Sequence, residues 1–77
     1  MRILLITTQE HHYEYLTQLG IDTYHILHYG DPLKAMDNLQ ELKPNILIVS
    51  AHDFPRHWKP LHVLLRDVSP DALFFLI

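Results

Sequence analysis

Three short, almost wholly apolar runs divide this chain, and they restrict its fold more than any other feature of the sequence. They lie at residues 2–7, 45–50 and 72–77. Each run has the length of a β-strand, and a continuous apolar run suits a strand that is buried on both faces. A weaker strand, which mixes apolar residues with two histidines, is predicted at residues 24–28.

Segments with helical spacing separate these strands. Tyr13, Leu16 and Leu19 are three residues apart and precede Gly20, which suits the left-handed position that closes a helix. Asp31 and Pro32 then predict a helix start, because the aspartate can cap free amides and proline suits the first helical position.

Two further signals complete the pattern of helices. Lys43-Pro44 is predicted to end the second helix. A loop with two prolines is expected at residues 54–60, and a third, short helix is expected after it. Four apolar residues mark that helix: Leu61, Leu64, Leu65 and Val68.

The alternation of strands and helices predicts an α/β fold with a parallel sheet and right-handed crossovers. Seventy-seven residues form one domain at most. The last apolar run reaches Ile77, and an open apolar edge invites pairing with another chain. We therefore expect residues 1–77 to be the N-terminal part of a longer protein, incomplete at the C-terminus, or else to form a homodimer through the edge of the fourth strand.

Composition excludes several classes of function. The formal charge is −3 and the six basic residues are scattered, which argues against direct nucleic-acid binding by this segment. No run is long enough to span a membrane, and no cleavage site of small residues follows the first apolar run, so no signal peptide is expected. The absence of cysteine excludes a disulfide scaffold and a thiolate zinc site, and it fits a cytoplasmic location.

The order and spacing of three segments carry a family resemblance. Residues 24–28 read as a second strand, residues 31–36 as a turn and helix start, and Lys43-Pro44-Asn45 leads into an aliphatic strand. In this the chain resembles the receiver domains of two-component response regulators, the CheY-like family. The resemblance implies a flavodoxin-like, three-layer fold with strand order 2-1-3-4, and a role in phosphorelay signalling.

Three residues depart from the receiver pattern. The resemblance places Thr7 and Thr8 where receivers carry the acidic pair that holds Mg²⁺, and Ser50 where they carry the phosphoacceptor aspartate. Threonine hydroxyls are poor Mg²⁺ ligands, and a serine without a neighbouring base is a weak nucleophile. We therefore predict a degenerate receiver, or pseudo-receiver, without enzymatic activity or a cofactor.

The alternative function is a small-ligand or metal sensor. In an open parallel sheet, ligands bind outside the carboxyl ends of the strands, where the strand order reverses. Imidazoles and a carboxylate expected near that crevice could hold a metal ion. These residues are His11, His12, His52, Asp53 and His57. The plainer interpretation is that they are solvated loop residues, because their spacing matches no metal signature.

Partner binding is the last predicted property. Trp58 lies in the predicted loop, and Phe74 and Phe75 lie in the last strand, so these aromatic residues are candidate contacts for a protein partner or a second copy.

No glycine-rich dinucleotide or phosphate-binding loop follows the first strand, where Thr8-Gln9-Glu10 stands instead.

Overall fold

The computed structural model describes residues 1–19 and 25–77. Its elements alternate along the chain as β1 (Arg2–Ile6), α1 (Glu10–Gln18), β2 (His25–Tyr29), α2 (Pro32–Leu42), β3 (Ile46–Val49), α3 (Trp58–Val68) and β4 (Leu73–Leu76). Gly20, predicted to close the first helix, and Tyr24, predicted to begin the second strand, lie outside the described residues.

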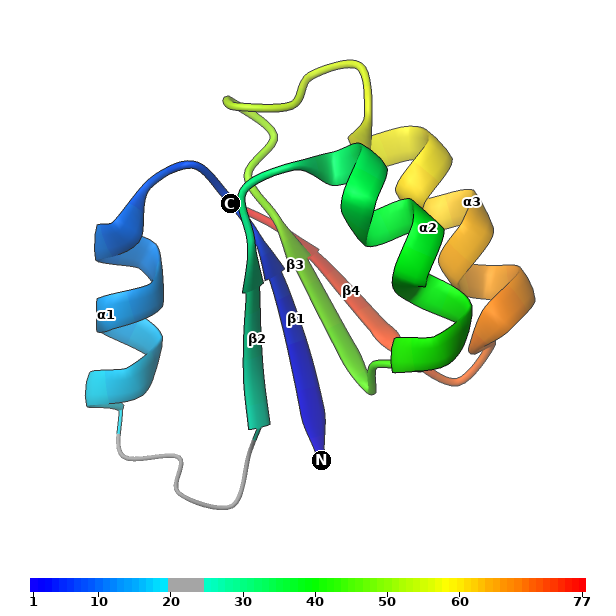
Figure 1. Ribbon diagram of the computed structural model, residues 1–77, viewed down its shortest axis with the longest axis horizontal. Helices are drawn as coiled ribbons and strands as arrows, with labels where there is room; N and C mark the ends of the chain where they lie inside the picture. The colour runs from blue at the N-terminus through cyan, green and yellow to red at the C-terminus, as the bar shows by residue number, and fades with distance from the viewer. Residues whose placement is uncertain (20–24) are drawn as a thin grey trace.

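The four strands form one parallel sheet in the order β2-β1-β3-β4. The helix α1 lies on one face of this sheet, and α2 and α3 lie on the other (Figure 1). The result is the three-layer, flavodoxin-like α/β arrangement, so the predicted fold class and strand order are confirmed. No helix within residues 1–19 and 25–77 is long and apolar enough to cross a membrane.

The core lies between the sheet and the pair α2 and α3. Alternate side chains of β1 and β3 point to this face, because successive side chains of a strand point to opposite faces. They pack against the apolar stripes of the two helices. The buried members are Leu4, Ile6, Ala35, Leu39, Leu47, Val49, Phe54, Leu61 and Leu65.

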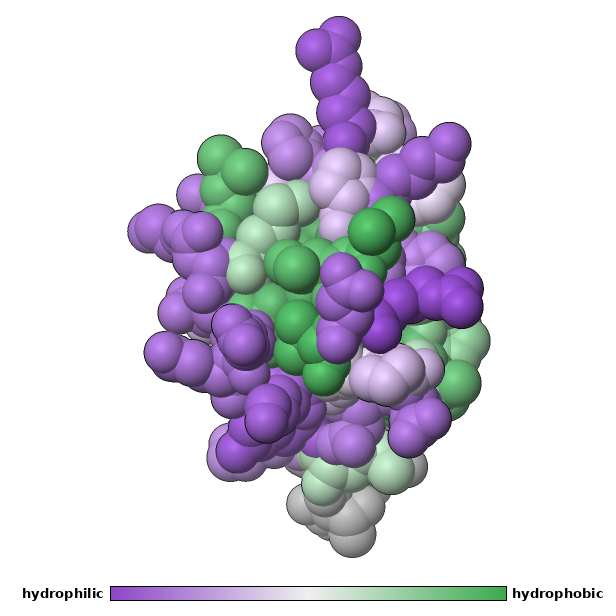
Figure 2. Space-filling model, turned by 90° about the vertical axis from the view of Figure 1, so that its right-hand side faces the viewer, coloured by the Kyte–Doolittle hydropathy of each residue, from purple (hydrophilic) through white to green (hydrophobic). Residues whose placement is uncertain are grey.

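The outer surface of α2 and α3 is partly apolar as well. Figure 2 views the molecule from the side on which these helices lie, and it shows an apolar area surrounded by hydrophilic side chains. Leu33 on α2 and Val63 on α3 are exposed.

The opposite face of the sheet is covered only in part. Ile3 and Leu5 of the central strand β1 are buried there, yet α1 has no buried residue. Ile48 of β3 is half-buried and Phe75 of β4 is 50% exposed. Residues 1–19 and 25–77 therefore leave the β3–β4 half of this face open.

The second helix begins and ends as the sequence predicts. The Asp31 side chain accepts a hydrogen bond from the Leu33 amide at 2.9 Å, and Pro32 is the first helical residue. At the other end, Lys43 adopts the left-handed conformation with φ of 42°, and its amide donates to the Leu39 carbonyl at 3.0 Å. The buried Pro44 follows directly.

The third helix begins earlier than predicted. Residues 54–60 were expected to be a loop, but α3 starts at Trp58 and includes Pro60. Proline is tolerated there because amides in the first helical turn have no intrahelical partner to lose. Trp58 therefore lies in a helix rather than a loop.

Candidate functional site

Two hydroxyl side chains meet at the carboxyl ends of the central strands. Thr7 follows β1 and Ser50 follows β3, and both side chains are buried. The Ser50 amide donates to the Ile6 carbonyl at 2.9 Å, so the two strand ends are hydrogen-bonded neighbours. The predicted strand order 2-1-3-4 makes the first and third strands neighbours, so the ends that carry Thr7 and Ser50 were expected at the same edge of the sheet.

Asp53 joins this pair from the loop after β3. Its Oδ2 accepts hydrogen bonds from the Thr8 amide at 2.9 Å and from the Thr7 hydroxyl at 3.1 Å. Its own amide donates to the Ser50 Oγ at 3.3 Å. The hydrogen bond from the Thr8 amide is the main reason why the pKa of Asp53 is lowered far below its usual value, with partial desolvation acting in the opposite direction. Asp53 is therefore an anion that ties the loop after β3 to the loop after β1.

The Thr7 hydroxyl fixes the tautomer of His12. Its single hydrogen goes to Asp53, and its oxygen accepts the Gln9 amide at 3.1 Å. His12 Nδ1 lies 2.8 Å from the same oxygen, so Nδ1 must carry a hydrogen and donate it. Nε2 makes no hydrogen bond within the described part of the chain. We call the chain of hydrogen bonds from His12 through Thr7 to Asp53 the His12 relay.

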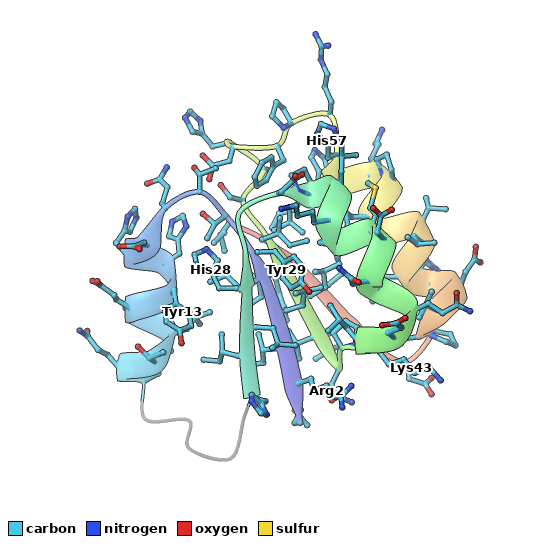
Figure 3. All side chains as sticks on the ribbon, in the orientation of Figure 1. Arg2, Tyr13, His28, Tyr29, Lys43 and His57 are labelled. Carbon is cyan, nitrogen blue, oxygen red and sulfur yellow. The ribbon has the colours of Figure 1, made fainter. Side chains whose placement is uncertain are left out.

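His28 attaches α1 to the sheet. Its Nε2 lies 2.9 Å from the Thr7 carbonyl oxygen and donates to it. The Tyr13 ring of α1 stacks on the imidazole, with ring centres 5.5 Å apart and planes 14° apart. Figure 3 shows the two side chains directed toward each other across the gap between α1 and β2.

The remaining predicted crevice histidines do not converge. The His11 ring lies 4.3 Å from that of His12, and the His11 side chain is exposed. His52 is exposed, and His57 packs edge-on against Phe54 on the side of α2 and α3 (Figure 3). Within residues 1–19 and 25–77, no three His, Asp or Glu side chains lie close enough to hold a metal ion. Of the five predicted crevice residues, the His12 relay connects two.

The three candidate partner contacts differ in exposure. Trp58 and Phe74 are half-buried and pack against the core, and Phe74 also stacks on His62 with ring centres 4.3 Å apart. Phe75 points to the opposite face of the sheet and is exposed. Of the three, Phe75 offers the most surface to a partner.

A groove between α1 and the β3–β4 half of the sheet was not predicted. Its volume is about 570 Å³, and its floor is formed by Ile48 and Ile77. One wall is formed by α1. The residues of that wall are His11, His12, Glu14, Tyr15, Leu16 and Gln18. Side-chain alternation places Ile48 and Ile77 on the α1 face, but the sequence does not show that this face is uncovered.

The charge of Asp53 predicts how stability depends on pH. Because its pKa is lower in the folded chain than in the unfolded chain, its stabilising effect is complete above pH of about 4 and is lost as the pH falls toward the folded-state pKa. We expect Asp53→Asn to lower the urea midpoint near neutral pH, and this deficit to shrink below pH of about 4. Asp71→Asn, at an exposed carboxylate, is the control. A deficit that stays constant down to strongly acidic pH would contradict the assignment.

Comparison with known proteins places the chain among N-terminal domains. The family model TP_0454_N, described as an N-terminal domain, matches residues 1–77. An uncharacterized protein of Treponema pallidum (strain Nichols) is 47% identical over 57 residues, which is 74% of this chain and 24% of that relative. The matched part therefore spans about a quarter of the relative's length. A search of the solved structures found no significant match.

Proposed function

Residues 1–77 belong to the TP_0454_N family of N-terminal domains, and we propose that this domain is a non-catalytic protein-interaction module in a signalling protein. The observation that carries the proposal is the β3–β4 half of the sheet, which residues 1–19 and 25–77 leave open on the α1 face. Ile48 is half-buried, and Leu73, Phe75 and Ile77 are exposed on the same face. Contiguous apolar surface of this kind is characteristic of interaction sites.

The edge of β4 adds backbone groups to this surface. The amides of Leu73 and Ile77 donate to the carbonyls of Asn45 and Val49, so alternate residues of β4 face β3. The intervening residues, Phe74 and Leu76, direct their amides toward the free edge. A protein segment that adds a strand there would gain main-chain hydrogen bonds.

We infer that the partner is a protein. A second copy of this chain is the partner that we propose to test first. Two copies would cover each other's apolar β4 side chains, which gives a homodimer through the fourth-strand region. The predicted contact Phe75 lies in this surface. Trp58 and Phe74 lie on the other face, so they contribute less to it.

The resemblance to receivers is the reason why we propose that the module is non-catalytic. By that resemblance, Thr7 and Thr8 correspond to the acidic pair that holds Mg²⁺ in receivers, and Ser50, which is buried, corresponds to the phosphoacceptor. Asp53 is hydrogen-bonded to the Thr7 hydroxyl and the Thr8 amide, so its carboxylate is already engaged within the protein. The cytoplasmic location expected from the sequence remains a prediction.

Incubation with acetyl phosphate and Mg²⁺ tests whether the chain accepts a phosphoryl group. We expect the intact mass to stay unchanged, because the strand ends offer hydroxyls where phosphoryl transfer needs a metal-bound acceptor carboxylate. A Ser50→Asp variant should also keep its mass unchanged, because Thr7 and Thr8 remain poor Mg²⁺ ligands. An added phosphoryl group on the unmodified chain, mapped to Ser50 or Asp53, would contradict the proposal.

A second candidate function is ligand sensing at the carboxyl ends of β1 and β3. It is favoured by the His12 relay, which orders one imidazole beside a groove instead of leaving it solvated. Ligand pockets are mostly apolar, with a few well-placed polar groups.

A further inference from the structure

We infer that the groove between α1 and the β3–β4 half of the sheet binds an amphipathic organic acid, with its acidic head at His12 and its apolar body over Ile48 and Ile77. The inference rests on the second candidate function, and it names the ligand class and the position. Ile48 and Ile77 also belong to the proposed association surface, so the ligand and a second copy would compete for the groove, and dilute protein favours the ligand.

The shape and lining of the groove suit a small molecule. Its volume of about 570 Å³ lies within the range of small-molecule sites. Ile48, Ile77 and Leu16 line it with aliphatic surface, and Tyr15 borders it from α1. An apolar body of roughly eight carbons gains free energy by covering this surface.

His12 gives the groove its preference for an acid. Nδ1 donates to Thr7, so Nε2 is the nitrogen left for a ligand. Binding of the acid form transfers its proton to Nε2, and the resulting carboxylate then accepts a hydrogen bond from the protonated ring. The resulting positive charge on the ring is offset through the Thr7 hydroxyl by the anionic Asp53, in a relay of hydrogen bonds of 2.8 and 3.1 Å. An alcohol of the same length lacks this charge-assisted hydrogen bond.

Neighbouring charged and titratable groups restrict where the head can lie. Glu14 lines the same groove farther along α1 and repels an anion. His11 also lines the groove beside His12, with ring centres 4.3 Å apart, and its side chain is exposed. The acidic head is therefore expected at the His12 end of the groove, and the apolar body is expected to extend over the floor.

The test uses octanoate and 1-octanol as probes, followed by NMR chemical shifts of the isoleucine and leucine methyl groups at dilute protein. We expect saturable binding of octanoate with a dissociation constant of about 1 mM, the strength typical of a ligand of this size. Octanol should bind roughly tenfold more weakly, because it lacks the charged hydrogen bond. The methyl groups of Leu16, Ile48 and Ile77 should shift.

Three variants separate the parts of the inference. His12→Asn keeps a nitrogen that can donate to Thr7 but removes Nε2, so octanoate should bind as weakly as octanol. Ile48→Asp should abolish the binding of both probes. His52→Asn, at an exposed histidine outside the groove, should change neither.

Several results would overturn the inference. Equal affinity for octanoate and octanol would show a merely apolar groove, and an unchanged His12→Asn variant would remove the role of the imidazole. A shift of Ile6, next to Thr7, without shifts of Leu16, Ile48 and Ile77 would move the ligand to the strand ends, which leaves ligand sensing standing without this site. Methyl shifts that follow protein concentration and not octanoate would show that a second copy occupies the groove.

Discussion

Replacing Leu4 by alanine should destabilise the fold by about 3 kcal/mol, within the usual range for a fully buried leucine. Leu4 is 0% exposed in the central strand β1, and it pairs with Leu27 of β2 and Leu47 of β3. A domain of 77 residues has an expected free energy of unfolding of about 4 to 12 kcal/mol. The loss of one side chain at this position therefore removes a large part of the total stability.

Urea unfolding followed by the fluorescence of Trp58 measures this effect. Trp58 is the single tryptophan and packs against the core, so its emission reports on core packing. Leu33→Ala is the matched control, because Leu33 is 58% exposed on α2 and should cost less than about 0.5 kcal/mol. Similar losses in both variants would show that β1 does not form the centre of the core.

The second large effect concerns association. We expect Phe75→Asp to weaken self-association by about a hundredfold, because a carboxylate buried in an apolar interface loses its hydration without gaining a partner. Phe75 is half exposed in the isolated chain, so the charge should leave the monomer folded. A charge on an edge strand is also a common natural means of preventing edge-to-edge pairing.

Sedimentation velocity over a range of protein concentrations compares the variant with the unmodified chain. Leu33→Asp places the same charge on the exposed surface of α2, and we expect it to associate like the unmodified chain. If Phe75→Asp and the unmodified chain sediment alike at all concentrations, the β3–β4 surface does not mediate association.

The sequence predicts the fold well because its signals are local. Continuous apolar runs locate β1, β3 and β4, and Asp31-Pro32 with Lys43-Pro44 brackets α2 almost to the residue. The start of α3 was missed, since two prolines indicated a loop while one of them fits a first helical turn. Because that start was placed too late, Trp58 was predicted to lie in a loop, whereas it is the first residue of α3.

The candidate site was predictable only in outline. Parallel strands bring Thr7 and Ser50 to one edge, and this depends on strand order alone. The His12 relay depends on how two loops fold over that edge, because Asp53 must reach the Thr8 amide and the Thr7 hydroxyl. Five residues were expected near one crevice, yet His52 is exposed and His57 packs against Phe54, so neither joins the His12 relay. The groove depends on how α1 lies beside the half-buried Ile48, and no residue pattern encodes that placement.

Amide hydrogen exchange in β4 tests the interaction surface most directly. The Phe74 and Leu76 amides point away from β3 and should exchange rapidly at low protein concentration. We predict that both become protected as concentration rises in the unmodified chain, and that they stay unprotected in Phe75→Asp. Equal exchange of these two amides at every concentration, with and without the added charge, would contradict docking at this edge.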